Sequence, residues 1–315
     1  MKTFLIIFFI IISLLVLAII AGITYFFFYA FYRKDKPDPE NLESKENRFI
    51  SGYSDEIKGG LEFFDTLSYE QVYIKSYDGV RLAAKYYPCD TDKTIILFHG
   101  YRGWARRDFA SVVKLYRGLG FNILLVDQRA NGLSGGKLIT FGAKEKHDVL
   151  SWVNFVLEKY GKDTRLCLDG LSMGAAVVMM SAGLDLPENV KAIVADCGYT
   201  SPADIIAHVA KRNFNIPGKA AVAVMNIPCK LFGGFSLYKS NTLESLSKND
   251  IPILFIHGKA DDFVPWYMTE LNYAANRGEK ELCFVDGAGH ALSYLTDKNK
   301  VESVLISFLK KHYDI

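Results

Sequence analysis

Short, continuous apolar runs alternate with longer amphipathic segments through most of this chain, and that rhythm constrains its fold more than any other feature. Residues 94–98, 121–126 and 164–168 have the length and composition of fully buried strands, and residues 104–119 and 143–160 between them have a helical pattern. Buried strands joined by crossover helices form a parallel sheet that is covered on both faces. We therefore expect an α/β fold with a mostly parallel central sheet.

The same alternation continues on both sides of this region. It predicts a hairpin at 71–87, strands at 191–195, 253–257 and 281–285, and a last helix at 298–311. Residues 199–250 break the rhythm, because they are longer than one crossover and contain Pro202, Pro217 and Pro228. We expect a helical cap there that shapes a substrate pocket. A surface insertion without a role in specificity is the alternative.

The amino terminus is almost wholly apolar and uncharged from Phe4 to Tyr32. A run longer than about 18 such residues can span a bilayer as a helix. A cleavable signal peptide would have a shorter apolar region and well-spaced small residues, and the spacing around Ala18 and Ala21 is imperfect. We expect residues 1–33 to be retained as a transmembrane anchor, a single pass in the cell membrane.

Charges around this segment point in two directions. Three basic residues after it, Arg33, Lys34 and Lys36, outnumber Lys2 and favour a cytoplasmic main domain. A very short basic tail before one hydrophobic segment is, however, the layout of a signal anchor, which exports the chain after it, and we expect an extracytoplasmic domain. Residues 34–60 are polar and predict a juxtamembrane linker, which leaves 61–315 for the main domain.

Composition excludes several classes of function. A net charge of +2 from 37 basic and 35 acidic residues lacks the surplus that nucleic-acid binding requires. Five cysteines occur without a C-x-x-C pair, which argues against a structural zinc site or a disulfide framework. We therefore expect no structural zinc site and no nucleic-acid partner.

The strongest chemical signal is Gly170-Leu171-Ser172-Met173-Gly174, which lies between an apolar strand and a helix-forming run. In that context G-x-S-x-G predicts a sharp turn that exposes the serine hydroxyl. Serine is a weak nucleophile at neutral pH, so it needs an adjacent base and a group that orients the base.

Candidates for both partners come after later strands. Asp261 and Asp262 lie in the loop after residues 253–257, and either could orient the base. His290 ends a glycine-rich loop after residues 281–285, where a mobile base would be placed. Among the other histidines, His99 and His257 precede glycines at strand ends, where a structural role is expected.

These motifs resemble the α/β-hydrolase superfamily, in particular bacterial membrane-anchored serine hydrolases similar to serine aminopeptidase-like and lysophospholipase-like proteins. The resemblance covers about Tyr69 to Tyr313 and includes the order serine, aspartate, histidine. Its H-G-x-x-D-x-x-V-P pattern selects Asp261 over Asp262. Residues 127–135 resemble the D-x-R-x-x-G-x-S loop, with Asn131 in place of the usual histidine.

The resemblance implies acyl transfer in two steps through Ser172, His290 and Asp261, with an oxyanion hole from the N–H groups of Met173 and Tyr101. It implies that no metal and no organic cofactor are needed. It implies a small-molecule ester, a lipid or a short peptide as substrate, with carboxylic esters preferred. A peptidase or acyltransferase with the same triad, and a non-catalytic receptor-like protein, are the alternatives.

Overall fold

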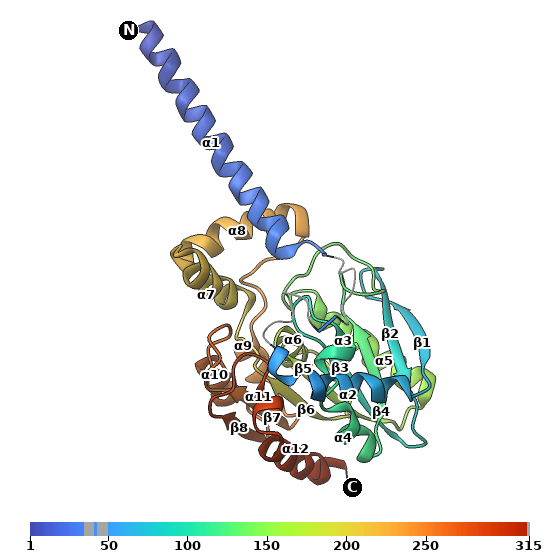
Figure 1. Ribbon diagram of the computed structural model, residues 1–315. Helices are drawn as coiled ribbons and strands as arrows, with labels where there is room; N and C mark the ends of the chain where they lie inside the picture. Colours follow the sequence, from blue (N-terminus) through green and yellow to red (C-terminus); the bar gives the residue numbers. More distant parts are fainter. Residues whose placement is uncertain (35–40, 43–49, 314–315) are drawn as a thin grey trace.

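A computed structural model of the chain describes residues 1–34, 41–42 and 50–313. Its centre is an eight-stranded sheet with the order β1-β2-β4-β3-β5-β6-β7-β8 (Figure 1). The strands are β1 (Glu70–Lys75), β2 (Arg81–Tyr87), β3 (Lys93–Phe98), β4 (Asn122–Asp127), β5 (Arg165–Leu171), β6 (Val190–Asp196), β7 (Ile253–Gly258) and β8 (Lys280–Val285). Each expected strand is present within a few residues of its predicted bounds.

The sheet is parallel from β4 to β8, and only β2 runs antiparallel to its neighbours β1 and β4. Strand β3 is buried along its whole length, as a central strand with helices on both faces must be. The predicted α/β architecture with a mostly parallel sheet is confirmed.

Helices cover both faces of this sheet. The helices are α1 (Lys2–Phe31), α2 (Ser54–Asp65), α3 (Ala105–Asp108), α4 (Val113–Gly118), α5 (Glu145–Tyr160), α6 (Met173–Ser181), α7 (Pro202–Phe214), α8 (Gly218–Gly233), α9 (Thr242–Leu246), α10 (Tyr267–Ala275), α11 (Ser293–Thr296) and α12 (Lys298–Tyr313). One apolar core lies between the sheet and α5, α6 and α10, and a second lies between the sheet and α2, α4 and α12.

Two helical predictions differ in detail from the structure. The helix expected at 104–119 is divided into the short helices α3 and α4. Helix α2 begins at Ser54, inside the segment expected to be linker, because Ile57, Leu61 and Phe64 give it an apolar face that is buried against the domain. Residues 35–40 and 43–49 of the expected linker lie outside the described residues.

The segment at 199–250, where a helical cap is predicted, contains helices α7, α8 and α9. Helices α7 and α8 pack against each other and lie at the end of the molecule from which α1 projects (Figure 1).

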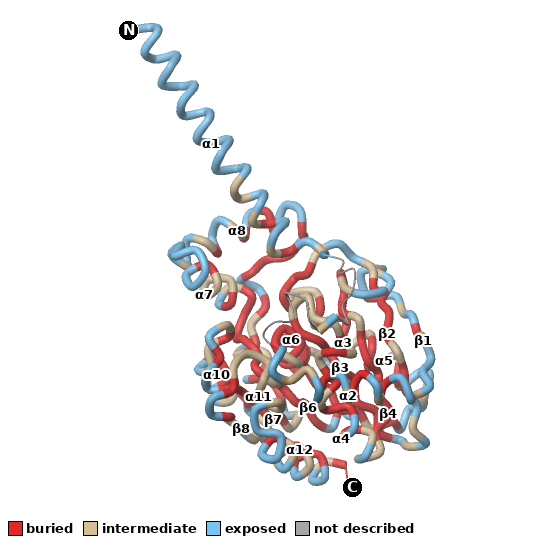
Figure 2. Tube along the Cα trace, in the orientation of Figure 1, coloured by how far each residue is buried: buried red, intermediate tan, exposed pale blue. Residues whose placement is uncertain are grey.

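Helix α1 is long and apolar enough to cross a membrane by length and composition, with a mean hydropathy of 3.5 in its most apolar window. Most of it extends away from the domain and is exposed (Figure 2). Its last turns behave differently, because Phe27 and Phe31 are buried in the main core. The aromatic run of residues 25–32 therefore serves partly to dock the helix onto the domain.

Candidate active site

Ser172 lies in the sharp turn between β5 and α6, with φ 56° and ψ −111°. A non-glycine residue in this region of backbone space is strained, and such strain persists only where the surroundings impose it. Gly174 explains part of this constraint: a Cβ atom there would lie 1.8 Å from the carbonyl oxygen of Phe98. The helix can approach β3 this closely only because that position carries no side chain.

His290 reaches Ser172 from the loop after β8. Its Nε2 lies 2.8 Å from the Ser172 Oγ, and its Nδ1 lies 2.7 Å from Oδ2 of Asp261. Since the carboxylate can only accept, Nδ1 carries a proton and donates it, which leaves Nε2 free to accept the serine proton. The structure therefore brings the three predicted side chains into one hydrogen-bonded chain, in the order that general-base activation of a serine requires.

Asp261 is buried in the loop after β7 and is held by several donors. Its Oδ1 accepts hydrogen bonds from the N–H groups of Phe263 and Val264, each at 2.9 Å, and its Oδ2 accepts from His257 and His290. Burial alone would raise the pKa of Asp261, but the hydrogen bonds from the two histidines outweigh it and hold the pKa below its ordinary value. The carboxyl is thus ionised at neutral pH.

Asp262, the alternative orienting residue, points elsewhere. Its carboxylate lies 2.7 Å from the guanidinium of Arg212 in the cap, and it is largely exposed. The geometry therefore favours Asp261.

His257 is a member of this network that the sequence indicated only as structural. It is fully buried, its Nδ1 lies 2.6 Å from the Thr269 hydroxyl, and its Nε2 lies 3.1 Å from Asp261 and 2.9 Å from the carbonyl oxygen of Val264. With Nε2 as the donor, this ring fixes the carboxylate that orients His290. The sequence feature that could have identified it is the first position of the H-G-x-x-D-x-x-V-P pattern, four residues before Asp261.

The loop after β3 lies against Ser172. A Cβ atom on Gly100 would be 3.5 Å from the Cβ of Ser172, and the Gly100 N–H donates to Asp108 at 3.0 Å. Of the two residues predicted to form the oxyanion hole, Met173 directly follows Ser172 at the start of α6, and Tyr101 directly follows Gly100 in this loop.

The loop also contacts the amino-terminal helix, which the sequence did not indicate. The Tyr101 hydroxyl donates to the carbonyl oxygen of Ala30 at 2.7 Å, and Arg102 donates to the carbonyl oxygen of Tyr29 at 2.6 Å. Arg33 donates to carbonyl oxygens of Gly132 and Ser134, both in the loop after β4. The end of α1 is thus fastened to two loops at the carboxyl ends of strands.

The loop after β4 is held by ion pairs of the buried Arg129. Arg129 donates to both oxygens of Asp148, at 2.7 and 2.6 Å, and to Asp78 at 2.9 Å. Asn131, at the position where the resemblance would place a histidine, donates to the carbonyl oxygen of Arg129 at 3.0 Å.

One group of side chains near the triad has the composition of a metal site. Ligand atoms of Cys197, Asp261 and His290 lie within 4.8 Å of one another. Burial, however, raises the pKa of the Cys197 thiol well above its ordinary value, so the thiolate that metals bind is disfavoured. A metal ion would also compete with the Nδ1 hydrogen bond of His290, and these residues fit a proton relay better than a metal.

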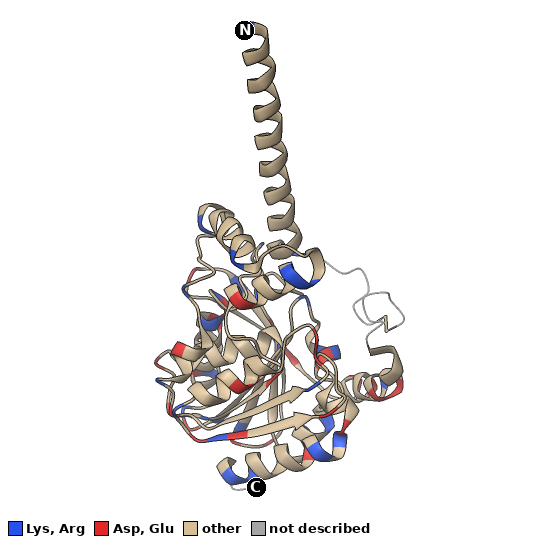
Figure 3. Cartoon of the chain, turned by 90° about the vertical axis from the view of Figure 1, so that its left-hand side faces the viewer, with Lys and Arg blue, Asp and Glu red and all other residues tan. Residues whose placement is uncertain are grey.

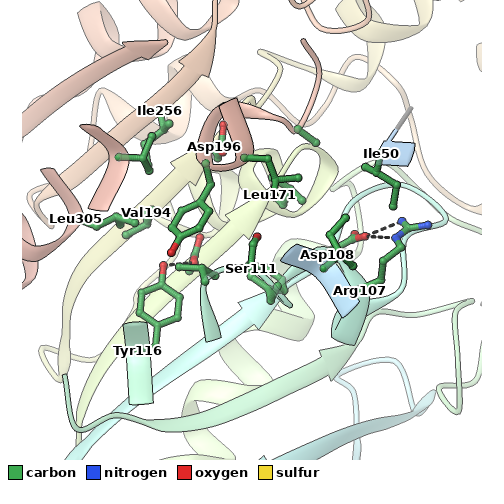
Figure 4. Close-up of a pocket in the computed structure, with 18 residues that line it drawn as sticks. Ile50, Arg107, Asp108, Ser111, Tyr116, Leu171, Val194, Asp196, Ile256 and Leu305 are labelled. Carbon is green, nitrogen blue, oxygen red and sulfur yellow. Dashed lines mark hydrogen bonds and ion pairs between the residues drawn. The ribbon is translucent and has the colours of Figure 1, made fainter. Parts of the chain in front are cut away.

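A cavity of about 80 Å³ lies behind the turn that carries Ser172 (Figure 4). Its lining includes Leu171 and Asp196, and Tyr116 donates from its hydroxyl to Asp169 at 2.6 Å. Burial raises the pKa of Asp169 to about 7, the Tyr116 hydrogen bond lowers it, and the nearby Asp196 raises it further. The cavity is thus lined by the buried carboxyl group of Asp169 and the partly buried one of Asp196.

Comparisons with known proteins agree with this architecture. The family described as "alpha/beta hydrolase fold" matches residues 93–221. The uncharacterized protein YqkD of Bacillus subtilis is 30% identical over 227 residues, which cover 72% of this chain and 74% of that protein. The alpha/beta hydrolase domain-containing protein WAV2 of Arabidopsis thaliana is 24% identical over 78% of this chain and 80% of that protein.

Among solved structures, the esterase Pf2001 of Pyrococcus furiosus superposes with a TM-score of 0.63 and 26% identity, over 78% of this chain and 92% of that chain. Fold, sequence relatives and solved structures agree with the resemblance that the motifs carry. The chain belongs to the α/β-hydrolase family.

Proposed function

We propose that this protein is a serine hydrolase that cleaves carboxylic esters through an acyl-enzyme intermediate. The observation that carries the proposal is the hydrogen-bonded chain from the Ser172 Oγ through His290 to the buried carboxylate of Asp261. The likeness to the Pyrococcus furiosus esterase supports the choice of ester over amide.

In the first step, Oγ of Ser172 attacks the ester carbonyl while Nε2 of His290 takes its proton. Asp261 stabilises the imidazolium that forms, and the N–H groups of Met173 and Tyr101 bind the oxyanion. His290 then protonates the departing alcohol, and a water molecule, deprotonated by the same nitrogen, releases the acid from the acyl-enzyme. This chemistry requires only groups of the chain, a small-molecule substrate and water.

We further propose that α1 anchors the enzyme in the cell membrane as a single-pass helix with the domain outside the cytoplasm. Its length of 30 residues and its lack of charge between Lys2 and Arg33 support the anchor. Protease treatment of intact cells tests the orientation, since an extracytoplasmic domain is degraded and a cytoplasmic one is protected.

The test of catalysis is labelling of the detergent-solubilised full chain with a fluorophosphonate probe. We expect wild type to be labelled, Ser172→Ala to be unlabelled, and Ser181→Ala to be labelled like wild type. Ser181 is a suitable control because it is the last residue of α6, the helix that follows Ser172. It is fully buried, and its hydroxyl donates to the backbone carbonyl of Val178 in the same helix. A folded wild-type protein that takes up no label would exclude the proposed function.

Substrate class is tested with acyl esters of graded chain length against matched amides and with an added alcohol acceptor. Faster turnover of the esters, with free acid as product, supports an esterase. Preference for the amide indicates a peptidase, and an acylated acceptor as the main product indicates an acyltransferase.

A further inference from the structure

Helix α8 of the cap is apolar on two opposite faces. Val222, Cys229 and Asn226 are buried toward the domain. On the other side, Val224, Ile227 and Leu231 recur at helical spacing, and Ile227 and Leu231 are 57% and 73% exposed. A contiguous apolar patch exposed on a helix commonly marks a contact with protein or lipid, and no described element covers this outer face.

The outer face of α8 is continuous with the amino-terminal helix. The ring of Phe232, itself 72% exposed, lies 6.1 Å from the ring of Phe27, and Phe214 at the end of α7 lies 5.1 Å from Phe26. Helix α8 crosses the base of α1 at the end of the domain from which α1 projects (Figure 1). Exposed apolar residues thus occur both on α1 and on the adjoining helices α7 and α8, where parts of the chain are exposed (Figure 2).

The length of α1 sets the distance between the cap and the bilayer. Residues 2–21 form the continuously exposed stretch of the helix, and about 20 residues at 1.5 Å each give roughly 30 Å, the thickness of the hydrocarbon core. Phe26 and Phe27, which contact α7 and α8, follow this stretch within about 9 Å along the helix axis. If α1 spans the membrane, α8 must therefore lie at the depth of the lipid headgroups.

Charge on the cap fits this position. Residues 211–239 contain Lys211, Arg212, Lys219, Lys230 and Lys239 and no aspartate or glutamate. Segments coloured for lysine and arginine lie near the base of α1 (Figure 3). Lysines beside an apolar helix face are the composition of an interfacial helix that binds anionic lipids.

The candidate active site lies directly behind this surface. The loop of Gly100 and Tyr101 touches both Ser172 and the last turn of α1, through the Tyr101 hydroxyl on Ala30. The Tyr101 ring also stacks on Phe141, which contacts Phe31 at 5.4 Å. One layer of side chains thus separates the candidate nucleophile from the membrane-proximal end of α1.

We propose that the outer face of α8, formed by Val224, Ile227 and Leu231, is a second membrane contact that lies in the lipid interface beside α1 and presents the active site to acyl esters carried by the bilayer. The substrate part of this proposal rests on the esterase function proposed above, whereas the membrane contact does not. The bilayer is the occupant that the apolar stripe, the basic residues and the reach of α1 jointly favour.

The membrane contact is tested with a fluorophore on the full chain in vesicles of phosphatidylethanolamine and phosphatidylglycerol. A nitrobenzoxadiazole label is placed on Leu231→Cys in a Cys89→Ser background, because Cys89 is the only described cysteine that is not buried. Leu282→Cys is the matched control, since Leu282 is also exposed but lies in the edge strand β8, away from α1 (Figure 1).

We expect the label at 231 to emit at shorter wavelength and to be quenched by doxyl lipids, and the label at 282 to be quenched by aqueous iodide. If iodide quenches the label at 231 as strongly as the label at 282, the membrane contact is refuted.

The substrate part is tested with Leu231→Glu and Leu282→Glu in the same vesicles. For Leu231→Glu we expect hydrolysis of a bilayer-embedded long-chain acyl ester to fall about tenfold, while hydrolysis of a water-soluble short-chain ester stays unchanged. Leu282→Glu should change neither rate. An unchanged ratio of the two rates in Leu231→Glu overturns the substrate part. A wild-type chain that hydrolyses neither ester refutes the esterase function instead, and the fluorophore result still decides the membrane contact.

Discussion

Replacing the buried Asp169 with asparagine should change the pH dependence of stability in a defined direction. Asp169 lies in β5, is fully buried apart from the cavity behind Ser172, and accepts a hydrogen bond from Tyr116. Burial raises its pKa from 3.8 to about 7, so the folded protein keeps this carboxyl protonated under conditions where the unfolded chain ionises it. Asparagine has nearly the same shape and cannot ionise.

The sign is set by proton linkage. Between pH 4 and pH 7 the folded state binds more protons than the unfolded state, so the unfolding free energy of wild type decreases as the pH rises. The pKa values of Asp169 in the unfolded and folded states differ by about three units, and each unit corresponds to about 1.36 kcal/mol. By pH 8 the unfolding free energy of wild type has therefore decreased by about 4 kcal/mol. The Asp169→Asn variant lacks this loss. Its stability relative to wild type should therefore increase with pH and level off above the folded-state pKa.

Thermal unfolding of the full chain in detergent, followed by circular dichroism from pH 4.5 to pH 8.5, measures this difference. At roughly 2 °C per kcal/mol, we expect the Tm of the variant relative to wild type to rise by up to about 8 °C across the series. Asp163→Asn is the control, because Asp163 precedes the same strand but is exposed, and its Tm difference should be flat with pH. A flat difference for Asp169→Asn as well would refute the assignment of a protonated, buried carboxyl at this position.

Three further substitutions test the site. Asp261→Asn should lower kcat/KM for an ester by on the order of 10³–10⁴ without unfolding the protein, because the imidazolium loses its charged partner. Steady-state kinetics measures the loss, and circular dichroism checks the fold. A loss below about tenfold would remove Asp261 from the triad. His257→Gln should lower kcat by roughly tenfold at unchanged KM and shift the acidic limb of the pH–rate profile. The reason is that one hydrogen bond to the Asp261 carboxylate is weakened. An unchanged profile would reduce His257 to a packing role. Gly174→Ala should destabilise the fold by roughly 3–5 kcal/mol, because its Cβ would overlap the carbonyl of Phe98. The destabilisation is measured as a lower Tm. Gly118→Ala is the control and should leave Tm nearly unchanged, because a Cβ atom at Gly118 would have no atom outside its own stretch of chain within 4 Å.

The sheet and the turn at Ser172 were predictable because their signals are local. A buried strand such as residues 94–98 is apolar throughout, and the glycines around Ser172 meet a steric demand that arises within a few residues of it. Ser172, Asp261 and His290 each follow the carboxyl end of a strand, β5, β7 and β8 respectively. Neighbouring parallel strands bring those ends to one edge of the sheet, so the proximity of the three side chains resulted from the topology.

The contacts that depend on distant segments were not predictable in this way. His257 looked like an ordinary strand-end histidine, since its partners Thr269 and Asp261 are recognisable only once the loop has folded around it. Asp169 lies just beyond the strand predicted at 164–168, and its raised pKa results from burial, with Tyr116 and Asp196 as its close polar neighbours.

By itself the sequence determined the α/β class, the strained serine turn and the long apolar helix, because periodicity, turn chemistry and helix length act over a few residues at a time. Only the tertiary structure decided what the end of that helix does. Phe27 and Phe31 belong to an aromatic run that suits a membrane interface, and they are buried because Phe141, Phe232 and Phe235, distant in sequence, surround them in the fold. Burial of an aromatic ring depends on neighbours that are distant in sequence. A run of similar aromatic residues therefore does not indicate which of them will be buried.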